Sequence, residues 1–365
     1  MLTKQTGPRF VTAIAGLALL AGCSGGGSGL TTPGQSVAPG QSAAQSVARS
    51  ASLLARVPKN SHSVARPDVA PHKGGAVHPF VNSTAIDATS NTIAISDAAD
   101  NVVNVYDSSG NLLAQLTGFS EPQGMASDIK GDLFVADTAN SRIQIYAAGF
   151  KSPPTTLSDP GQYPAGVDSF HNGEWVAASN IISTSGGAGS VTIYKSGVAQ
   201  ATISNPTFAR VYFCAFDATG NLYVDGSDPN GSVVVGEIAK ATSGGTTLAT
   251  LTTGNTISFP GQVQVTTTGQ IAIDDQLGPT VYTYNPPKSG SLGSPVSTTS
   301  LSGSSDPVTF AFTNDMKDLY TADAGLAVSN EFAYPAGGSP VSTINVGGQP
   351  IGTAVIPTQY PKKKK

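Results

Sequence analysis

Five aspartates recur at the ends of predicted strands, and carboxylates in such a pattern could hold a metal ion or act as acids and bases. They are Asp97, Asp137, Asp225, Asp275 and Asp323. Arranged around a common axis, they would form a ring suited to a divalent cation. An aspartate at a strand end can instead cap the following turn by accepting hydrogen bonds from backbone N–H groups. One such residue per copy favours capping, so we predict no catalytic and no metal-binding residues among them.

Histidine is scarce in the part of the chain that is rich in predicted strands. The sequence has 4 histidines, and His62, His72 and His78 precede that part. His171 lies in Phe170–Gly173, which predicts a hairpin turn. A single histidine excludes a histidine-rich metal site and gives little basis for a Ser-His-Asp triad.

The run Asp225–Gly231, followed by Glu237, approaches a calcium-binding loop. Its first ligand position holds Gly226 rather than an acid, and Val233–Val235 reads as strand. We therefore predict a tight turn between two strands. Phosphate-binding loops and dinucleotide fingerprints are absent from the sequence, so we predict no cofactor.

The two cysteines have different predicted roles. Cys214 lies in the apolar run Val211–Phe216, which predicts a buried and unreactive thiol. Cys23 follows a short segment, Phe10–Leu20, that is mainly apolar and small. That segment is too short to cross a bilayer, for which about 20 apolar residues are needed. With Lys4 and Arg9 before it, residues 1–22 have the make-up of an export signal.

The tetrapeptide Leu20-Ala21-Gly22-Cys23 resembles the lipobox of bacterial lipoproteins. This resemblance implies that the signal is removed before Cys23 and that lipid on its thiol holds the protein on a membrane. In such proteins an aspartate after the cysteine marks inner-membrane retention. Ser24 therefore favours the outer membrane or the cell surface within the envelope. An ordinary signal peptide with an incidental cysteine is the alternative.

Charge is unevenly distributed along the chain. Residues 24–77 carry five Lys/Arg against one acid, whereas residues 78–361 carry eight Lys/Arg against 22 Asp/Glu, a net charge of −14. This acidic region excludes nucleic acid as a partner. The basic tail 362–365 could contact anionic lipid or another acidic surface, or serve only as a solubilising tail.

Residues 23–77 and 78–361 differ in composition as well. The first segment is rich in Ser, Ala, Gln, Gly and Pro, which predicts a disordered tether. The second contains repeats: residues 91–106 align with residues 131–146 without a gap, placing Asp97 on Asp137. Six copies follow one another at intervals of about 40 to 50 residues, each with about four alternating strands.

Four short strands per repeat predict an all-β fold, a β-propeller of six four-stranded blades, with seven blades as the alternative. Pro350–Ile356 looks like a further first strand with no blade after it. It would close the ring beside the beginning of the domain. We expect the domain to be monomeric.

Residues 133–146, LFVADTANSRIQIY, closely resemble the NHL repeat. Only this copy matches the motif in full, because the first copy keeps Asp97 but has Val102 where Arg142 stands. The resemblance implies a propeller and little chemistry, since propellers host binding, scaffolding and catalysis alike.

Two functions follow from this organisation. The preferred one is a non-enzymatic binding or scaffold module for a protein or glycan, exported and anchored to the membrane through Cys23. The alternative is a metal-dependent hydrolase like the gluconolactonase propellers, which use the central channel. None of their motifs matches residue by residue. Three or more Asp, Glu or Asn side chains converging in the channel would favour the enzyme.

Overall fold

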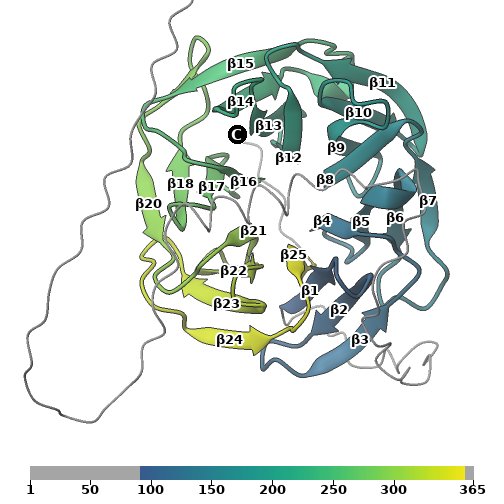
Figure 1. Cartoon of the computed structure of the whole chain (residues 1–365), viewed down its shortest axis with the longest axis vertical. Coiled ribbons are helices and arrows are strands. Elements are labelled where there is room, and N and C mark those ends of the chain that lie inside the picture. Colours follow the sequence, from purple (N-terminus) through teal and green to yellow (C-terminus); the bar gives the residue numbers. More distant parts are fainter. Residues whose placement is uncertain (1–90, 358–365) are drawn as a thin grey trace, which may run out of the picture. The chain divides into compact units, whose positions relative to one another are not determined.

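The computed structural model describes residues 91–357, which form six β-sheets around a central axis (Figure 1). Each sheet is one blade of four strands, and one blade has an additional short strand. The six-bladed β-propeller predicted from the repeats is therefore confirmed. The signal, the tether with Cys23 and the basic tail lie outside the described residues.

Each blade has an inner strand beside the axis, followed outward by a second, a third and an outer strand. Blade 1 consists of β25 (Pro350–Ile356), β1 (Thr92–Asp97), β2 (Val102–Tyr106) and β3 (Leu112–Leu116). Blade 2 consists of β4 (Pro122–Ser127), β5 (Leu133–Asp137), β6 (Arg142–Tyr146) and β7 (Thr155–Ser158). Blade 3 consists of β8 (Gln162–Phe170), β9 (Trp175–Ser183), β10 (Ser190–Lys195) and β11 (Val198–Ser204).

The remaining blades follow the same order. Blade 4 consists of β12 (Arg210–Phe216), β13 (Leu222–Ser227), β14 (Val233–Ile238) and β15 (Leu248–Thr253). Blade 5 consists of β16 (Pro260–Val265), β17 (Ile271–Asp275), β18 (Thr280–Tyr284) and β20 (Ser297–Ser300). Blade 6 consists of β21 (Pro307–Phe312), β22 (Asp318–Asp323), β23 (Val328–Ala333) and β24 (Ser342–Asn345). The extra strand β19 (Ser291–Gly293) leaves blade 5 and pairs in parallel with β15 of blade 4.

The C-terminal strand β25 closes the ring. It pairs antiparallel with β1, from Thr92 opposite Ile356 to Asp97 opposite Pro350. The predicted closure is thus confirmed, and the closed ring leaves no inner strand without its partner. Both ends of the described chain lie where the inner strands end, which we call the terminal face. The opposite side, where the inner strands begin and the chain passes between blades, is the connector face.

Proline is the first residue of the inner strand in four blades and the third residue of β8 in blade 3. Each of these prolines pairs with the residue that ends the regular part of the second strand, as Pro122 does with Asp137 and Pro350 with Asp97. Proline has no N–H to donate, which suits the free edge that faces the axis. A register shift in the pairing then follows in all six inner strands. The five are Pro122, Pro164, Pro260, Pro307 and Pro350.

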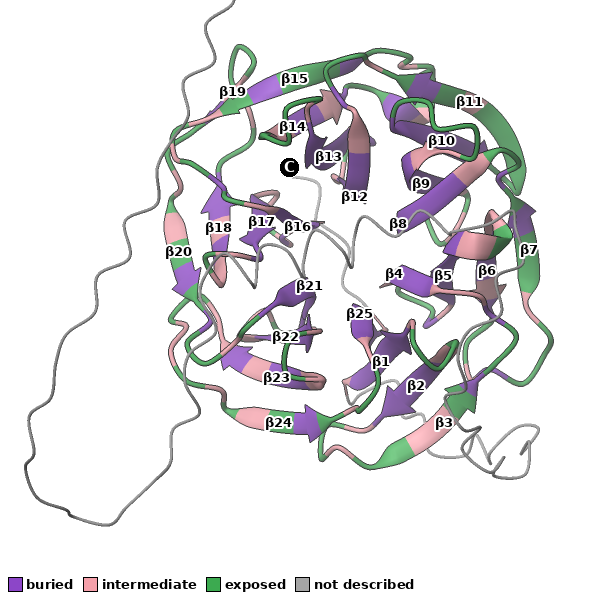
Figure 2. Ribbon diagram, in the orientation of Figure 1, coloured by how far each residue is buried: buried purple, intermediate pink, exposed green. Residues whose placement is uncertain are grey.

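The core lies between the blades. Buried residues dominate the three inner strands of each blade, and exposed residues concentrate on the outer strands (Figure 2). Between blades 1 and 2, for example, Val103 and Val105 share a buried cluster with Met125 and Leu133. Such burial stabilises each blade only when its neighbours are present. Across the described residues, no helix is long and apolar enough to cross a membrane.

Candidate functional site

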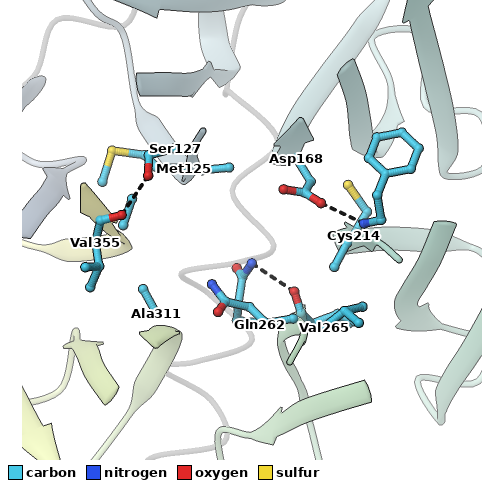
Figure 3. Close-up of a pocket in the computed structure, with 14 residues that line it drawn as sticks. Met125, Ser127, Asp168, Cys214, Gln262, Val265, Ala311 and Val355 are labelled. Carbon is cyan, nitrogen blue, oxygen red and sulfur yellow. Dashed lines mark hydrogen bonds between the residues drawn. The ribbon is translucent and has the colours of Figure 1, made fainter. Parts of the chain in front are cut away.

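The inner strands enclose a cavity of about 60 Å³ in the half of the channel nearer the terminal face (Figure 3). Its lining comes from all six blades, and its polar side chains include Ser127, Asp168, Gln262 and Gln264. A volume of this size accommodates a few water molecules. It is well below the roughly 300–1,000 Å³ of most small-molecule sites.

One layer of the channel wall is built from six equivalent positions. Strand pairing places each of them opposite the second or third residue of the second strand, as Ala126 lies opposite Phe134 and Asp168 opposite Ala177. Small side chains in most of the layer allow the inner strands to approach one another. The six residues are Ala126, Asp168, Ala215, Gln264, Ala311 and Ala354.

The two polar members of this layer reach across to the next blade. The Asp168 Oδ2 accepts a hydrogen bond from the backbone N–H of Phe216 at 2.6 Å. The Gln264 Oε1 accepts one from the backbone N–H of Phe312 at 3.3 Å. Burial raises the pKa of Asp168 to about 7, because the charged form loses its hydration in the channel.

Apolar side chains occupy the other half of the channel. At the register shifts near the connector face, Ala165, Tyr212, Val308 and Ile351 project from four different blades and belong to one buried apolar cluster. Ala165, Val308 and Ile351 offer neither a metal ligand nor an acid or base, whereas Tyr212 carries a phenol whose pKa is raised by burial. In blade 2 the equivalent residue is the buried Gln123, so this half of the channel is mainly, not wholly, apolar.

Four of the five predicted strand-end aspartates cap turns and connections, as the sequence predicts. The Asp97 Oδ1 accepts hydrogen bonds from the backbone N–H groups of Ala99 at 3.0 Å and Gln349 at 2.9 Å. The carboxylate of Asp323 accepts from four backbone N–H groups and that of Asp275 from three. Asp137, the fourth, accepts from the backbone of Ser120 at 2.7 Å. Each of these aspartates is at most 2% exposed.

The capping role predicted for Asp225 is wrong. In blade 4 the residue opposite Val211 is Gly226, so Gly226 occupies the position of the other four aspartates. Asp225 stands one residue earlier, and its Oδ1 accepts a hydrogen bond from the backbone N–H of Phe213 at 3.0 Å. The error arose because β13 runs on to Ser227, so that counting from the apparent end of the strand shifts the register.

Asp225 and Asp274 occupy equivalent positions in neighbouring blades and are both fully buried. Among the described residues, no group donates a hydrogen bond to Asp225 Oδ2 or to either carboxylate oxygen of Asp274. Burial raises the pKa of Asp225 well above its usual value. Burial, with the nearby carboxylates led by Asp275 and Asp306, does the same for Asp274.

Serines at the same position in other blades show what a protonated carboxyl could do there. The Ser96 hydroxyl of blade 1 donates to the Gln123 carbonyl of blade 2 at 2.8 Å. The Ser179 hydroxyl of blade 3 donates to the Tyr212 carbonyl of blade 4 at 2.8 Å. A neutral carboxyl at Asp274 carries one O–H donor and can make the same kind of bond to the next blade.

The described residues do not assemble a metal site of the hydrolase type. Within residues 91–357, no group of three or more His, Cys, Asp or Glu is arranged to hold a metal ion. The channel cavity contributes one carboxylate, Asp168, together with the amides of Gln262 and Gln264. The arrangement that would favour a gluconolactonase-like enzyme is not formed by this part of the chain.

Three other residues singled out from the sequence have local structural roles. His171 lies in the turn between β8 and β9, where its ring stacks on Phe170 with centroids 3.9 Å apart. Cys214 is 1% exposed, which confirms the predicted burial of its thiol, and this burial raises its pKa. The Asp228 Oδ1 accepts from the backbone N–H groups of Asn230 and Ser232, which confirms a turn rather than a calcium loop.

The full copy of the repeat motif forms one hydrogen-bonded network in blade 2. The Arg142 Nε lies 2.6 Å from the Asp137 Oδ2, and the Arg142 Nη2 donates to the Gly118 carbonyl at 2.9 Å. Asn140 donates to the same Asp137 oxygen at 2.9 Å. Residues 119–146 match the NHL repeat. In this chain the Asp, Asn and Arg of the NHL repeat hold the connection between blades 1 and 2 against the end of β5. Their role is structural.

Comparisons with whole proteins identify the fold only. No curated protein matches the sequence. A chain of the nidogen–laminin complex superposes with a TM-score of 0.59 at 13% identity, covering 74% of this chain and 99% of its own. A Bacteroides caccae protein of unknown function gives 0.54 at 12% identity, covering 73% and 99%. A functionally unknown Desulfotomaculum acetoxidans protein gives 0.50 at 14% identity, covering 75% and 100%.

Asp168 and Asp274 were missed as site residues, although the sequence holds a signal for the first. Asp168 stands four residues after Pro164, as Ala126 stands four after Pro122 and Gln264 four after Pro260. Aligning the blades on these prolines would have revealed the channel layer. Asp274 has no such signal, because the adjacent Asp275 is the residue that aligns with the strand-end aspartates of the other blades.

Proposed function

We propose that this protein is an exported lipoprotein, anchored to the cell envelope by lipid on Cys23, whose propeller binds a protein or glycan without catalysing a reaction. The outer membrane or the cell surface is its proposed location. The fold supports a binding or scaffold module, and one fold relative comes from a complex between two proteins, nidogen and laminin.

The observation that carries this proposal is the position of the chain ends. Thr92 and Ile356 are paired at the terminal face, so a tether that enters at residue 91 approaches the propeller from that side. We infer that the connector face, which lies opposite the paired residues Thr92 and Ile356, is the face available to a partner. A flexible tether of the predicted composition over residues 23–77 would have a root-mean-square reach of about 40 Å.

The lipid anchor can be tested with the full-length chain in a bacterium that processes lipoproteins. Metabolic labelling with an alkyne-tagged fatty acid should mark the wild-type protein and leave a Cys23→Ser variant unmarked. The variant should also leave the membrane fraction. Labelling of both proteins, or of neither, would refute lipidation at Cys23.

Partner binding through the connector face can be tested by photo-crosslinking with two matched positions. Leu326 is 47% exposed in the turn between β22 and β23 on the connector face, and Ile129 is 50% exposed in the turn between β4 and β5 on the terminal face. A photoreactive amino acid at position 326 should give discrete protein or glycan adducts in cells. Adducts from position 129 alone, or from neither position, would overturn the proposed face.

A further inference from the structure

A second cavity lies on the connector face between blades 4 and 5. It has a volume of about 440 Å³, within the roughly 300–1,000 Å³ range of specific binding pockets. The start of β14, the end of β15 and the connection into β16 enclose it. Its floor is aliphatic and continues into the buried cluster at the propeller centre, through Val233, Val235, Leu251 and Ile257.

The pocket wall is held in place before any partner arrives. The Thr253 Oγ1 donates to the Asn255 carbonyl at 2.8 Å, and the Tyr284 hydroxyl donates to the Asn255 Oδ1 at 2.6 Å. The carboxylate of Asp275 accepts from the backbone N–H of Ser258 at 2.9 Å. Because these bonds fix the connection between the blades, binding would cost little ordering of the protein.

The lining suits an uncharged group with an apolar part, because four of its nine residues are aliphatic and the other five carry neutral hydroxyl or amide groups. No Lys, Arg, Asp or Glu lines this pocket, although the domain around it is strongly acidic. The lining also has no aromatic ring on which a sugar could stack. Three exposed hydroxyls, from Ser232, Thr256 and Ser258, edge the aliphatic floor and can bond to a peptide backbone.

We propose that this pocket receives an uncharged apolar side chain of a protein partner, with the flanking peptide groups bonded to the hydroxyl edge. The inference rests on the proposed binding function and names the partner's anchoring group. Anchors of this kind carry much of the free energy of protein association. The pocket's place on the connector face puts it on the side away from the proposed tether.

The test uses methyl NMR on the full chain, with N-acetyl-leucine amide as the probe and N-acetylglucosamine and N-acetyl-glutamate amide as comparisons. The leucine probe should shift the methyl signals of Val233, Val235, Leu251 and Ile257 saturably, with a Kd on the order of a few millimolar. Val233→Asp should weaken this binding at least about tenfold, since it places a charge on the apolar floor. Val198→Asp, at a position 63% exposed on β11, is the matched control and should leave the Kd unchanged.

A second variant keeps the test interpretable if Val233→Asp fails to fold. Ser232→Trp extends an indole from the rim and should block the probe while the remaining methyl spectrum stays native. Absence of saturable shifts, or tighter binding of the sugar or the acidic probe, would overturn the proposal. If the NMR result is negative but position 326 still gives crosslinked adducts, only the pocket assignment is wrong. If position 326 gives no adducts either, the proposed binding function is wrong as well.

Discussion

Asp168 and Gln264 occupy the same position two blades apart, and each accepts a hydrogen bond from the backbone N–H of the residue 48 positions later. Both bonds run from one inner strand to the next, from β8 to β12 and from β16 to β21. Gln264 achieves with a neutral amide what Asp168 achieves with a titratable carboxyl. Comparing the two residues therefore tests what the charge of a carboxylate contributes at this position of the channel.

Replacing Asp168 by Asn should make the stability of the propeller less dependent on pH. The pKa of Asp168 is raised from 3.8 to about 7 in the folded state, so folding favours its protonated form. This stabilisation is fully present below about pH 4 and is lost as pH rises towards 7. Between pH 4 and pH 8 the free energy of unfolding of the wild type should fall by about 1–2 kcal/mol more than that of Asp168→Asn. This figure allows for the partial exposure of the Asp168 carboxyl to the cavity.

Urea unfolding at a series of pH values measures this difference. Asp100→Asn is a suitable control, because Asp100 is exposed in the turn after β1. The control should follow the wild-type curve at every pH. A parallel pair of curves for wild type and Asp168→Asn would show that Asp168 titrates normally in the folded protein.

Asp274→Ser should stabilise the protein at neutral and alkaline pH. The pKa of Asp274 lies well above its usual value, so the buried carboxyl stays protonated in the folded state. The free energy of unfolding of the wild type therefore falls as pH rises. A serine here can donate to the next blade as Ser96 and Ser179 do. We expect a gain of about 1–3 kcal/mol at pH 8 that disappears below pH 4.

The same variant separates a protonated carboxyl from a carboxylate that binds a cation. Thermal unfolding of the wild type should be insensitive to EDTA and to added calcium. A melting temperature that falls with EDTA, together with loss of stability in Asp274→Ser, would instead show that a cation occupies this position. That result would revive the hydrolase alternative.

The fold could be predicted from the sequence because each blade repeats the same local pattern. Asp97 aligns with Asp137 and Tyr106 with Tyr146, and the structure pairs these strands in the same register in both blades. The spare strand Pro350–Ile356 had only one place to pair, beside β1. Alternation and repeat length therefore favoured six blades and this closure, with seven blades as the alternative.

The site was less predictable because it depends on contacts between blades. Asp225 looked like a strand-end cap, and only the pairing of Val211 with Gly226 shows that it belongs with Asp274. The pocket floor combines Val235 and Leu251 of blade 4 with Ile257 of the following connection. The periodicity of the sequence describes strands only. It does not indicate that the connection into β16 leaves a pocket beside β14 and β15.

Arg142→Val should lower stability modestly, since valine is the natural residue at the equivalent position in blade 1, Val102. The change removes an ion pair whose arginine is 30% exposed and whose aspartate is fully buried. Asp137 keeps its bonds from Ser120 and Asn140, so we expect a loss of about 1–2 kcal/mol. Asp137→Ala should cost more, since it leaves those donors and the guanidinium unpaired. Equal losses, measured by urea unfolding, would contradict this order.

Gly352→Ala should strongly destabilise the ring where it closes. A Cβ at Gly352 would lie 2.1 Å from the Gln123 carbonyl oxygen of the neighbouring blade, and backbone atoms there cannot move without breaking the Ser96 contact. We expect a loss of about 2–4 kcal/mol, with hydrogen exchange increasing first in β1 and β25. Gly269→Ala is the comparison, because its added Cβ meets nothing within 4 Å and reports only the backbone cost of a φ of +83°. Similar losses in the two variants would mean that crowding at the closure does not limit the fold.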